Sequence, residues 1–133
     1  MIKRLIPFAL AFGLSACGSS NTTSTAPTTG TGLTTDTFTG TVAVGGSDFK
    51  TFTVAQTGEV DVTLTVAAVP MGLAMGLPGG SGCVPLTGAS TTATAGSAAQ
   101  LVGKVSPGSF CVLVSDVGNA TASVAYTVTV VHP

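Results

Sequence analysis

The sequence predicts an all-β domain, a small antiparallel β-sandwich of about seven or eight strands over residues 36–133. Apolar and polar residues alternate along several short segments, as they do in strands with one buried face. Turn-forming glycine, asparagine and proline residues separate these segments at intervals of about eight to twelve residues. Threonine, valine and alanine are abundant, and the apolar residues do not follow a helical period.

The first half of this domain contains three predicted strands. They cover residues 38–44, 51–54 and 60–66, and turns are predicted at residues 45–48 and 56–58 because these are rich in Gly, Ser, Asp and Thr. The third is the most regular, because four apolar residues alternate with Asp61, Thr63 and Thr65. The side chains predicted to face the core are Phe38, Val42, Val44, Phe52, Val54, Val60, Val62, Leu64 and Val66.

The second half contains four or five further segments. Residues 71–77 are predicted to form a strand with Met71, Leu73, Met75 and Leu77 on one face, and residues 78–82 are predicted to form a loop. Residues 87–99 consist of threonine, alanine, serine and glycine and are predicted only as a strand or a loop. The last strands are predicted at residues 101–105, 110–114 and 122–131, where Tyr126 shares its parity with valines and is therefore assigned to the core.

The beginning and end of this domain resemble the bacterial pre-peptidase C-terminal domains. The similar residues are Phe38-Thr39-Gly40-Thr41, Gly46 to Val54, Pro107 to Val114 and Ala125 to Val130. The resemblance implies a β-sandwich that accompanies a secreted peptidase. The segment Met71-Gly72-Leu73-Ala74-Met75 departs from the family, whose members often have acidic residues before an aromatic strand there. Calcium binding is therefore not carried over to this chain.

Residues 1–16 are predicted to be a cleaved export signal. Lys3 and Arg4 supply the positive end, and a ten-residue apolar stretch follows at residues 5–14. A helix needs about twenty apolar residues to cross a bilayer, so this stretch is too short for a permanent span.

The segment Leu14-Ser15-Ala16-Cys17 resembles the lipobox of bacterial lipoproteins. The resemblance implies cleavage between Ala16 and Cys17, a diacylglycerol on the Cys17 thiol, and an acyl chain such as palmitate on the new amine. Several acyl chains anchor a protein stably where one would not. An ordinary secretory signal with a chance cysteine is the alternative. The expected location is the cell envelope: the outer membrane of a host with two membranes, since Gly18 is not aspartate, or otherwise the outer face of the plasma membrane.

Residues 17–35 are predicted to be the lipidated cysteine and a flexible tether. Eleven of the eighteen residues from Gly18 to Thr35 are serine or threonine, and none is charged. A segment of this composition buries too little apolar surface to fold. The sequence leaves open whether the tether is glycosylated.

Two cysteines remain if Cys17 carries lipid, and outside the cytoplasm Cys83 and Cys111 are expected to form a disulfide. A metal site would need further ligands, and the single histidine, His132, is expected to fray at the chain end. Nucleophilic catalysis needs an oriented base, and hydrolysis by acid and base needs converging carboxylates. No such set is evident, so we predict no catalytic residues, no metal and no cofactor.

Charge and aromatic content narrow the choice of partners. Beyond residue 16 the chain has two lysines and five acidic residues, so a phosphate-binding patch, and with it nucleic-acid binding, is not expected. A glycan site would have to be polar, because the chain has no tryptophan and its one tyrosine is assigned to the core. The repeated Thr-x-Thr pairs resemble ice-binding faces. A solvated sheet face is the favoured interpretation, because the pairs lack a regular spacing along the chain.

Two functions are therefore expected. The favoured one is a membrane-anchored lipoprotein with a non-catalytic β-sandwich that serves envelope structure or binds a protein or glycan partner. The alternative is an accessory domain that partners a separately encoded secreted hydrolase, as the family resemblance implies.

Overall fold

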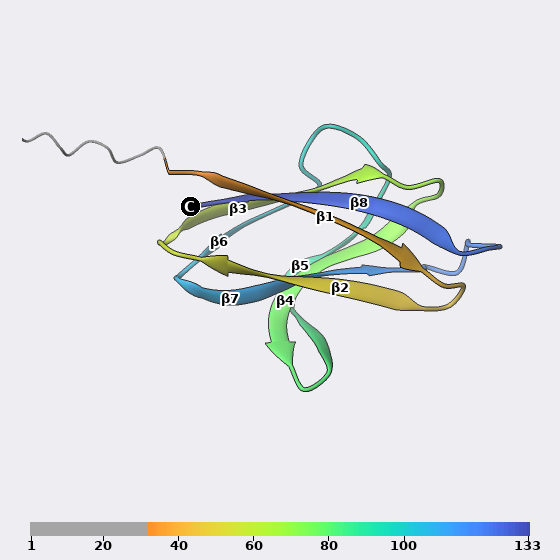
Figure 1. The fold of residues 1–133 in the computed structure, drawn as a ribbon, viewed down its shortest axis with the longest axis horizontal. Coiled ribbons are helices and arrows are strands. Elements are labelled where there is room, and N and C mark those ends of the chain that lie inside the picture. Colours follow the sequence, from red (N-terminus) through yellow and green to blue (C-terminus); the bar gives the residue numbers. More distant parts are fainter. Residues whose placement is uncertain (1–31) are drawn as a thin grey trace, which may run out of the picture. The chain divides into compact units, whose positions relative to one another are not determined.

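A computed structural model describes residues 32–133, which form eight strands in two four-stranded antiparallel sheets (Figure 1). The all-β class and the number of strands are therefore confirmed. The strands are β1 (Thr34–Val42), β2 (Ser47–Val54), β3 (Gly58–Val66), β4 (Met71–Gly79), β5 (Gly82–Ala93), β6 (Leu101–Val105), β7 (Gly108–Ser115) and β8 (Val124–His132). The predicted signal peptide, the Ala16–Cys17 cleavage site, the Cys17 anchor and most of the tether lie outside the described residues.

Each sheet contains strands from both the beginning and the end of the domain. Sheet A has the order β1-β8-β3-β6, and sheet B has the order β2-β7-β4-β5. Strand β1 pairs with β8 over nine residues without a break, from Thr34 opposite His132 to Val42 opposite Val124. The beginning of β1 and the C-terminus therefore lie at the same end of the sandwich (Figure 1). Strand β1 begins at Thr34, two residues before the predicted start of the domain.

Alternating valine, leucine, methionine and aromatic side chains fill the space between the sheets. The predicted alternation is confirmed along most of the chain, because residues two apart on a strand point to the same face. Tyr126 is buried as predicted. The core consists of Val42, Phe52, Val54, Val60, Val62, Leu64, Met71, Leu73, Met75, Ala93, Val105, Phe110, Val112, Val114, Val124, Tyr126, Val128 and Val130.

Three side chains predicted to face the core are exposed instead: Val44 by 56%, Val66 by 54% and Leu77 by 46%. Val44 lies in the turn after β1 has ended. The register of β3 against β8 shifts between Leu64 and Val66, where β3 has one extra residue, so Val66 turns to the outer face. Leu77 lies beyond Gly76, the last residue of β4 that pairs with β7, and pairs only with Val84 in the β4–β5 hairpin.

Two other boundaries differ from the prediction. Asp48 was assigned to a turn but belongs to β2, where it shares the parity of the buried residues Phe52 and Val54. Residues 78–82, predicted to be a loop, are mostly the ends of β4 and β5, which meet at Gly80 and Ser81. Residues 87–99 were predicted only as a strand or a loop. In the structure, residues 87–93 form the second half of the long edge strand β5.

Candidate interaction surface

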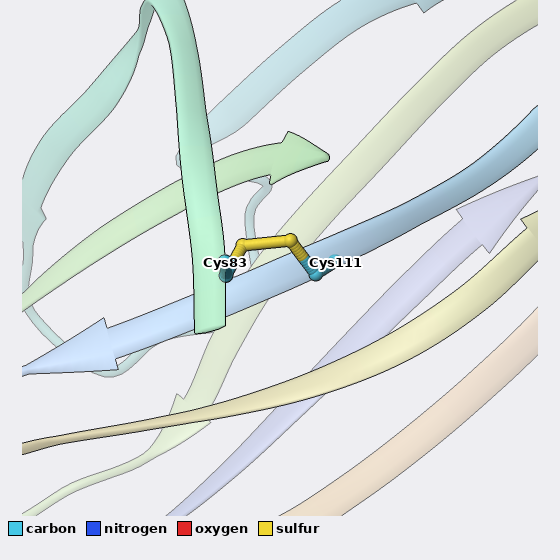
Figure 2. The surroundings of a disulfide bond; sticks show 2 residues. All are labelled: Cys83 and Cys111. Atoms are coloured by element: carbon cyan, nitrogen blue, oxygen red, sulfur yellow. A yellow bond between two sulfur atoms is a disulfide. The ribbon is translucent and has the colours of Figure 1, made fainter. Parts of the chain in front are cut away.

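A disulfide joins Cys83 to Cys111, as the sequence predicted, with 5.9 Å between their Cα atoms. Cys111 has the parity of the outer face of β7, yet it is fully buried. The beginning of β5 crosses in front of β7 at this point, and the bond attaches it there (Figure 2). The disulfide therefore holds the β4–β5 hairpin against the outer side of sheet B.

Three polar side chains, Tyr126, Asp48 and Lys50, form a cluster between the edge strands β1 and β2. The Tyr126 hydroxyl donates to Oδ2 of Asp48 over 2.7 Å, and Nζ of Lys50 lies 3.6 Å from the same oxygen. Burial of the phenol, followed by its bond to Asp48, raises the pKa of Tyr126 above its ordinary value of 10.0. Gly40 makes this contact possible, because a Cβ there would lie 2.7 Å from the Tyr126 hydroxyl oxygen.

His132 does not fray, contrary to the sequence prediction. It ends β8, is only 4% exposed, and lies over the ring of Phe52 with 5.3 Å between ring centroids. Nε2 contacts Oδ2 of Asp36 at 3.0 Å, and Nδ1 lies 3.3 Å from the carbonyl oxygen of Pro133. Both ring nitrogens thus have a partner, and neither partner is a hydroxyl or thiol that the imidazole could activate. The pair joins the start of β1 to the end of β8.

Asp116 connects the loops at the opposite end of the sandwich. Its Oδ2 accepts the N–H of Gly45 at 2.8 Å, and its Oδ1 accepts those of Gly118, Asn119 and Ala120. The bond from Gly45, followed by that from Gly118, lowers the pKa of Asp116 below its ordinary value of 3.8. The β1–β2 turn and the β7–β8 loop are therefore joined through one carboxylate. The sequence carries no pattern that predicts this role.

The outer face of sheet A gathers eight threonines into what we call the threonine face. Thr37, Thr129 and Thr63 occupy one row across β1, β8 and β3, and Thr39 lies opposite Thr127 in the next row. The Thr65 hydroxyl donates to the carbonyl oxygen of Thr127 at 3.2 Å. The sequence identified the Thr-x-Thr pairs but not that three of them share one surface. The members are Thr35, Thr37, Thr39, Thr41, Thr63, Thr65, Thr127 and Thr129.

Asp61 occupies the same face of sheet A, in the row of Thr35 and next to Thr63 along β3. Its cross-strand neighbours are Val131 on β8 and Val102 on β6, which are both apolar. Oδ1 of Asp61 is buried and has no hydrogen-bond partner among residues 32–133. A buried acceptor without a donor is costly, and native proteins have few such atoms. In the sequence, Asp61 stands only as one of the polar residues that alternate with the apolar ones along residues 60–66.

Two features are absent from the part of the chain that the structure describes. Residues 32–133 contain no group of three or more His, Cys, Asp or Glu side chains placed to hold a metal ion. Across the same residues, no helix has the length and hydropathy needed to cross a membrane.

Comparison of the chain with known protein families and with curated proteins finds no match.

Proposed function

We propose that this protein is a lipid-anchored component of the bacterial cell envelope and that its β-sandwich is a non-catalytic binding module. The observation that carries the anchoring is Leu14-Ser15-Ala16-Cys17 at the end of a ten-residue apolar stretch. Acyl chains on Cys17 would hold the chain at a membrane, because each buried methylene contributes about 0.8 kcal/mol.

The geometry of the sandwich supports the binding role. The chain enters β1 at the end of the sandwich that also holds the C-terminus, and the β1–β2 turn lies at the opposite end. At that opposite end Asp116 holds two loops together, and Val44 and Val117 are exposed on them. The titratable pairs Tyr126–Asp48 and His132–Asp36 join strands to one another.

The anchor is tested by intact mass spectrometry of the membrane-extracted protein together with a Cys17→Ser variant. We expect a chain that begins at Cys17 and carries acyl chains, and a variant that is lost from the membrane fraction. The matched control is the double variant Cys83→Ala/Cys111→Ala, which should stay in the membrane fraction because it keeps Cys17. A native chain with an unmodified thiol or an uncleaved leader would overturn the proposed anchor.

The binding role is tested separately with the released Cys17→Ser protein. Added to envelope fragments from which lipid has been removed, it should sediment with them, because binding by the domain does not need the acyl chains. An unrelated secreted β-sandwich of similar charge serves as the control. Equal sedimentation of both proteins, or none of either, would refute the binding role and leave the anchor unaffected.

A further inference from the structure

The end of the β4–β5 hairpin stands apart from the rest of sheet B. Strand β4 makes its last pair with β7 at Gly76, and beyond it residues 77–79 pair only with residues 82–84 of β5. Figure 1 shows this end of the hairpin projecting from the body of the sandwich on the side of sheet B. We call residues 77–84 the arm.

The disulfide decides which side of the arm faces solvent. Cys83 bonds to Cys111 on the outer face of β7, so the side of the arm that carries Cys83 and its cross-strand partner Pro78 faces sheet B. Leu77 and Val84 lie directly opposite each other and have the other parity, so they point away from sheet B. The two residues are 46% and 60% exposed. The solvent-facing side of the arm is therefore an apolar pair that a covalent bond holds in place.

The arm lies in a part of the chain without charge. No Asp, Glu, Lys, Arg or His occurs from Val62 to Gly103, a range that includes the whole of β4 and β5. Transfer of an ionised group out of water is far more costly than transfer of an apolar one. The arm can therefore enter the interface of a bilayer without the cost of removing a charge from water.

The small size of the apolar pair argues against a protein as its occupant. A stable protein interface buries roughly 800 Å² on each partner, whereas the arm offers two apolar side chains. A bilayer needs no matching surface, and its interface binds apolar groups in proportion to the area they bury. By itself, a contact of this size is too weak to hold the released Cys17→Ser protein at a membrane.

The predicted anchor places a bilayer within reach of the arm. Cys17 precedes Thr34, the first residue of β1, by 17 residues. A chain of this length spans at most about 60 Å, so an anchored domain stays close to the membrane. Such a linkage raises the effective concentration of a second contact to the order of millimolar, at which a weak contact forms.

We infer that the arm is a membrane-docking element and that Leu77 and Val84 enter the interface of the bilayer that holds the acyl chains of Cys17. This inference goes beyond the proposed function and rests on it for the anchor. Because the disulfide fixes the arm against sheet B, docking turns that sheet toward the bilayer. The threonine face lies on the other sheet, so it is directed away from the membrane and stays accessible.

The direct test uses a tryptophan reporter, because the chain has no tryptophan of its own. Acylated Leu77→Trp protein is reconstituted in vesicles of phosphatidylcholine with brominated acyl chains, which quench tryptophan on contact. It should lose most of the emission that it shows in unbrominated vesicles, at low and at high salt alike, because the contact is not electrostatic. The control is Val102→Trp on β6 of sheet A, where the native valine is 57% exposed, and it should keep its emission.

An added charge tests whether the arm itself causes the docking. In the Leu77→Trp chain, Val84→Glu places a carboxylate opposite the reporter and should restore most of the emission. Val102→Glu in the same chain makes the matched change on sheet A and should leave the quenching as it was. Equal emission of the two double variants would show that the tryptophan alone seeks the bilayer, and would overturn the inference.

The native arm is tested with a phosphatidylcholine that carries a photoactivatable diazirine in its acyl chain. After irradiation of the acylated native protein in vesicles of this lipid, peptide mass spectrometry should find the label of the domain concentrated in residues 77–84. A domain without label, or with its label on sheet A, would contradict the docking of the arm.

The outcomes separate this inference from the proposed function. An acylated chain, identified by its intact mass, with an unquenched reporter at position 77 would overturn membrane docking and leave the anchor standing. A blue shift of this reporter that grows with protein concentration and does not respond to bromine would identify a second copy as the occupant, and would also overturn it. A chain without acyl groups would overturn the anchor and the inference together.

Discussion

The Tyr126 hydroxyl donates a 2.7 Å hydrogen bond to Oδ2 of Asp48, and this bond connects β8 of sheet A to β2 at the edge of sheet B. Strand β1 is the edge strand beside β8 in sheet A, and its residue Gly40 lies opposite Tyr126, against the bond between Tyr126 and Asp48. The bond therefore crosses the sandwich where the two edge strands β1 and β2 face each other. An inward-pointing charge on an edge strand also discourages pairing with another chain.

Tyr126→Phe is expected to lower the free energy of unfolding by about 1–2 kcal/mol, because Asp48 loses its phenol donor. Urea denaturation measures the change. The raised pKa of Tyr126 adds a pH dependence: the stabilisation is complete below the ordinary value of 10.0 and declines above it, where the unfolded chain ionises first. The variant should lack this part of the alkaline decline. Parallel alkaline profiles for the two proteins would contradict the assignment.

Gly40→Ala is expected to destabilise the domain by about 1–3 kcal/mol, because the added Cβ would collide with the Tyr126 side chain. Gly82→Ala is the matched control, since no atom lies within 4 Å of the Cβ position there. Thermal unfolding of the two variants measures the difference. Equal melting temperatures would show that Tyr126 and Asp48 can move aside without cost.

Removal of the disulfide by Cys83→Ala/Cys111→Ala is expected to cost about 3–4 kcal/mol, since the bond closes a loop over a sequence separation of 28 residues. Alanine avoids burial of a polar group at the fully buried Cys111. In the double variant, amide hydrogen exchange should accelerate most in the β4–β5 hairpin. The native protein with its disulfide reduced should show the same pattern of exchange. A uniform acceleration over both sheets would argue that the bond stabilises the whole domain rather than the hairpin.

Asp116→Asn is expected to loosen the loops around residues 43–46 and 116–120, because asparagine lacks the charge that attracts four backbone N–H groups. The folded pKa of Asp116 lies below 3.8, so its stabilisation is present above that pH and is lost as the pH falls through the folded pKa. The variant should therefore lose less stability on acidification than the native protein. The control is Glu59→Gln, which changes an exposed carboxylate on β3. If stability depends on acid pH in the same way in Glu59→Gln and in Asp116→Asn, the specific role of Asp116 is refuted.

Much of the strand pattern could be predicted because side-chain alternation is a local property. The alternation of Val60, Val62 and Leu64 identifies the buried face of β3 within five residues, and all three are buried in the structure. The prediction failed at Val66, where an extra residue of β3 relative to β8 reverses the parity. It failed at Leu77 because β4 continues there beyond its last pair with β7. The disulfide followed from counting, since Cys83 and Cys111 are the cysteines that remain once Cys17 is assigned to lipid.

The sequence by itself determined the all-β class, the number of strands, most of the core and the cysteine pair. Only the tertiary structure decided which strands are neighbours, and that choice brings Thr37 beside Thr129, Asp36 to His132, and Gly45 to Asp116. The physical reason is that alternation is local and strand pairing is not. Apolar and polar residues alternate within each strand and can be recognised in a few residues, whereas strand order and register depend on how all eight strands together enclose one core.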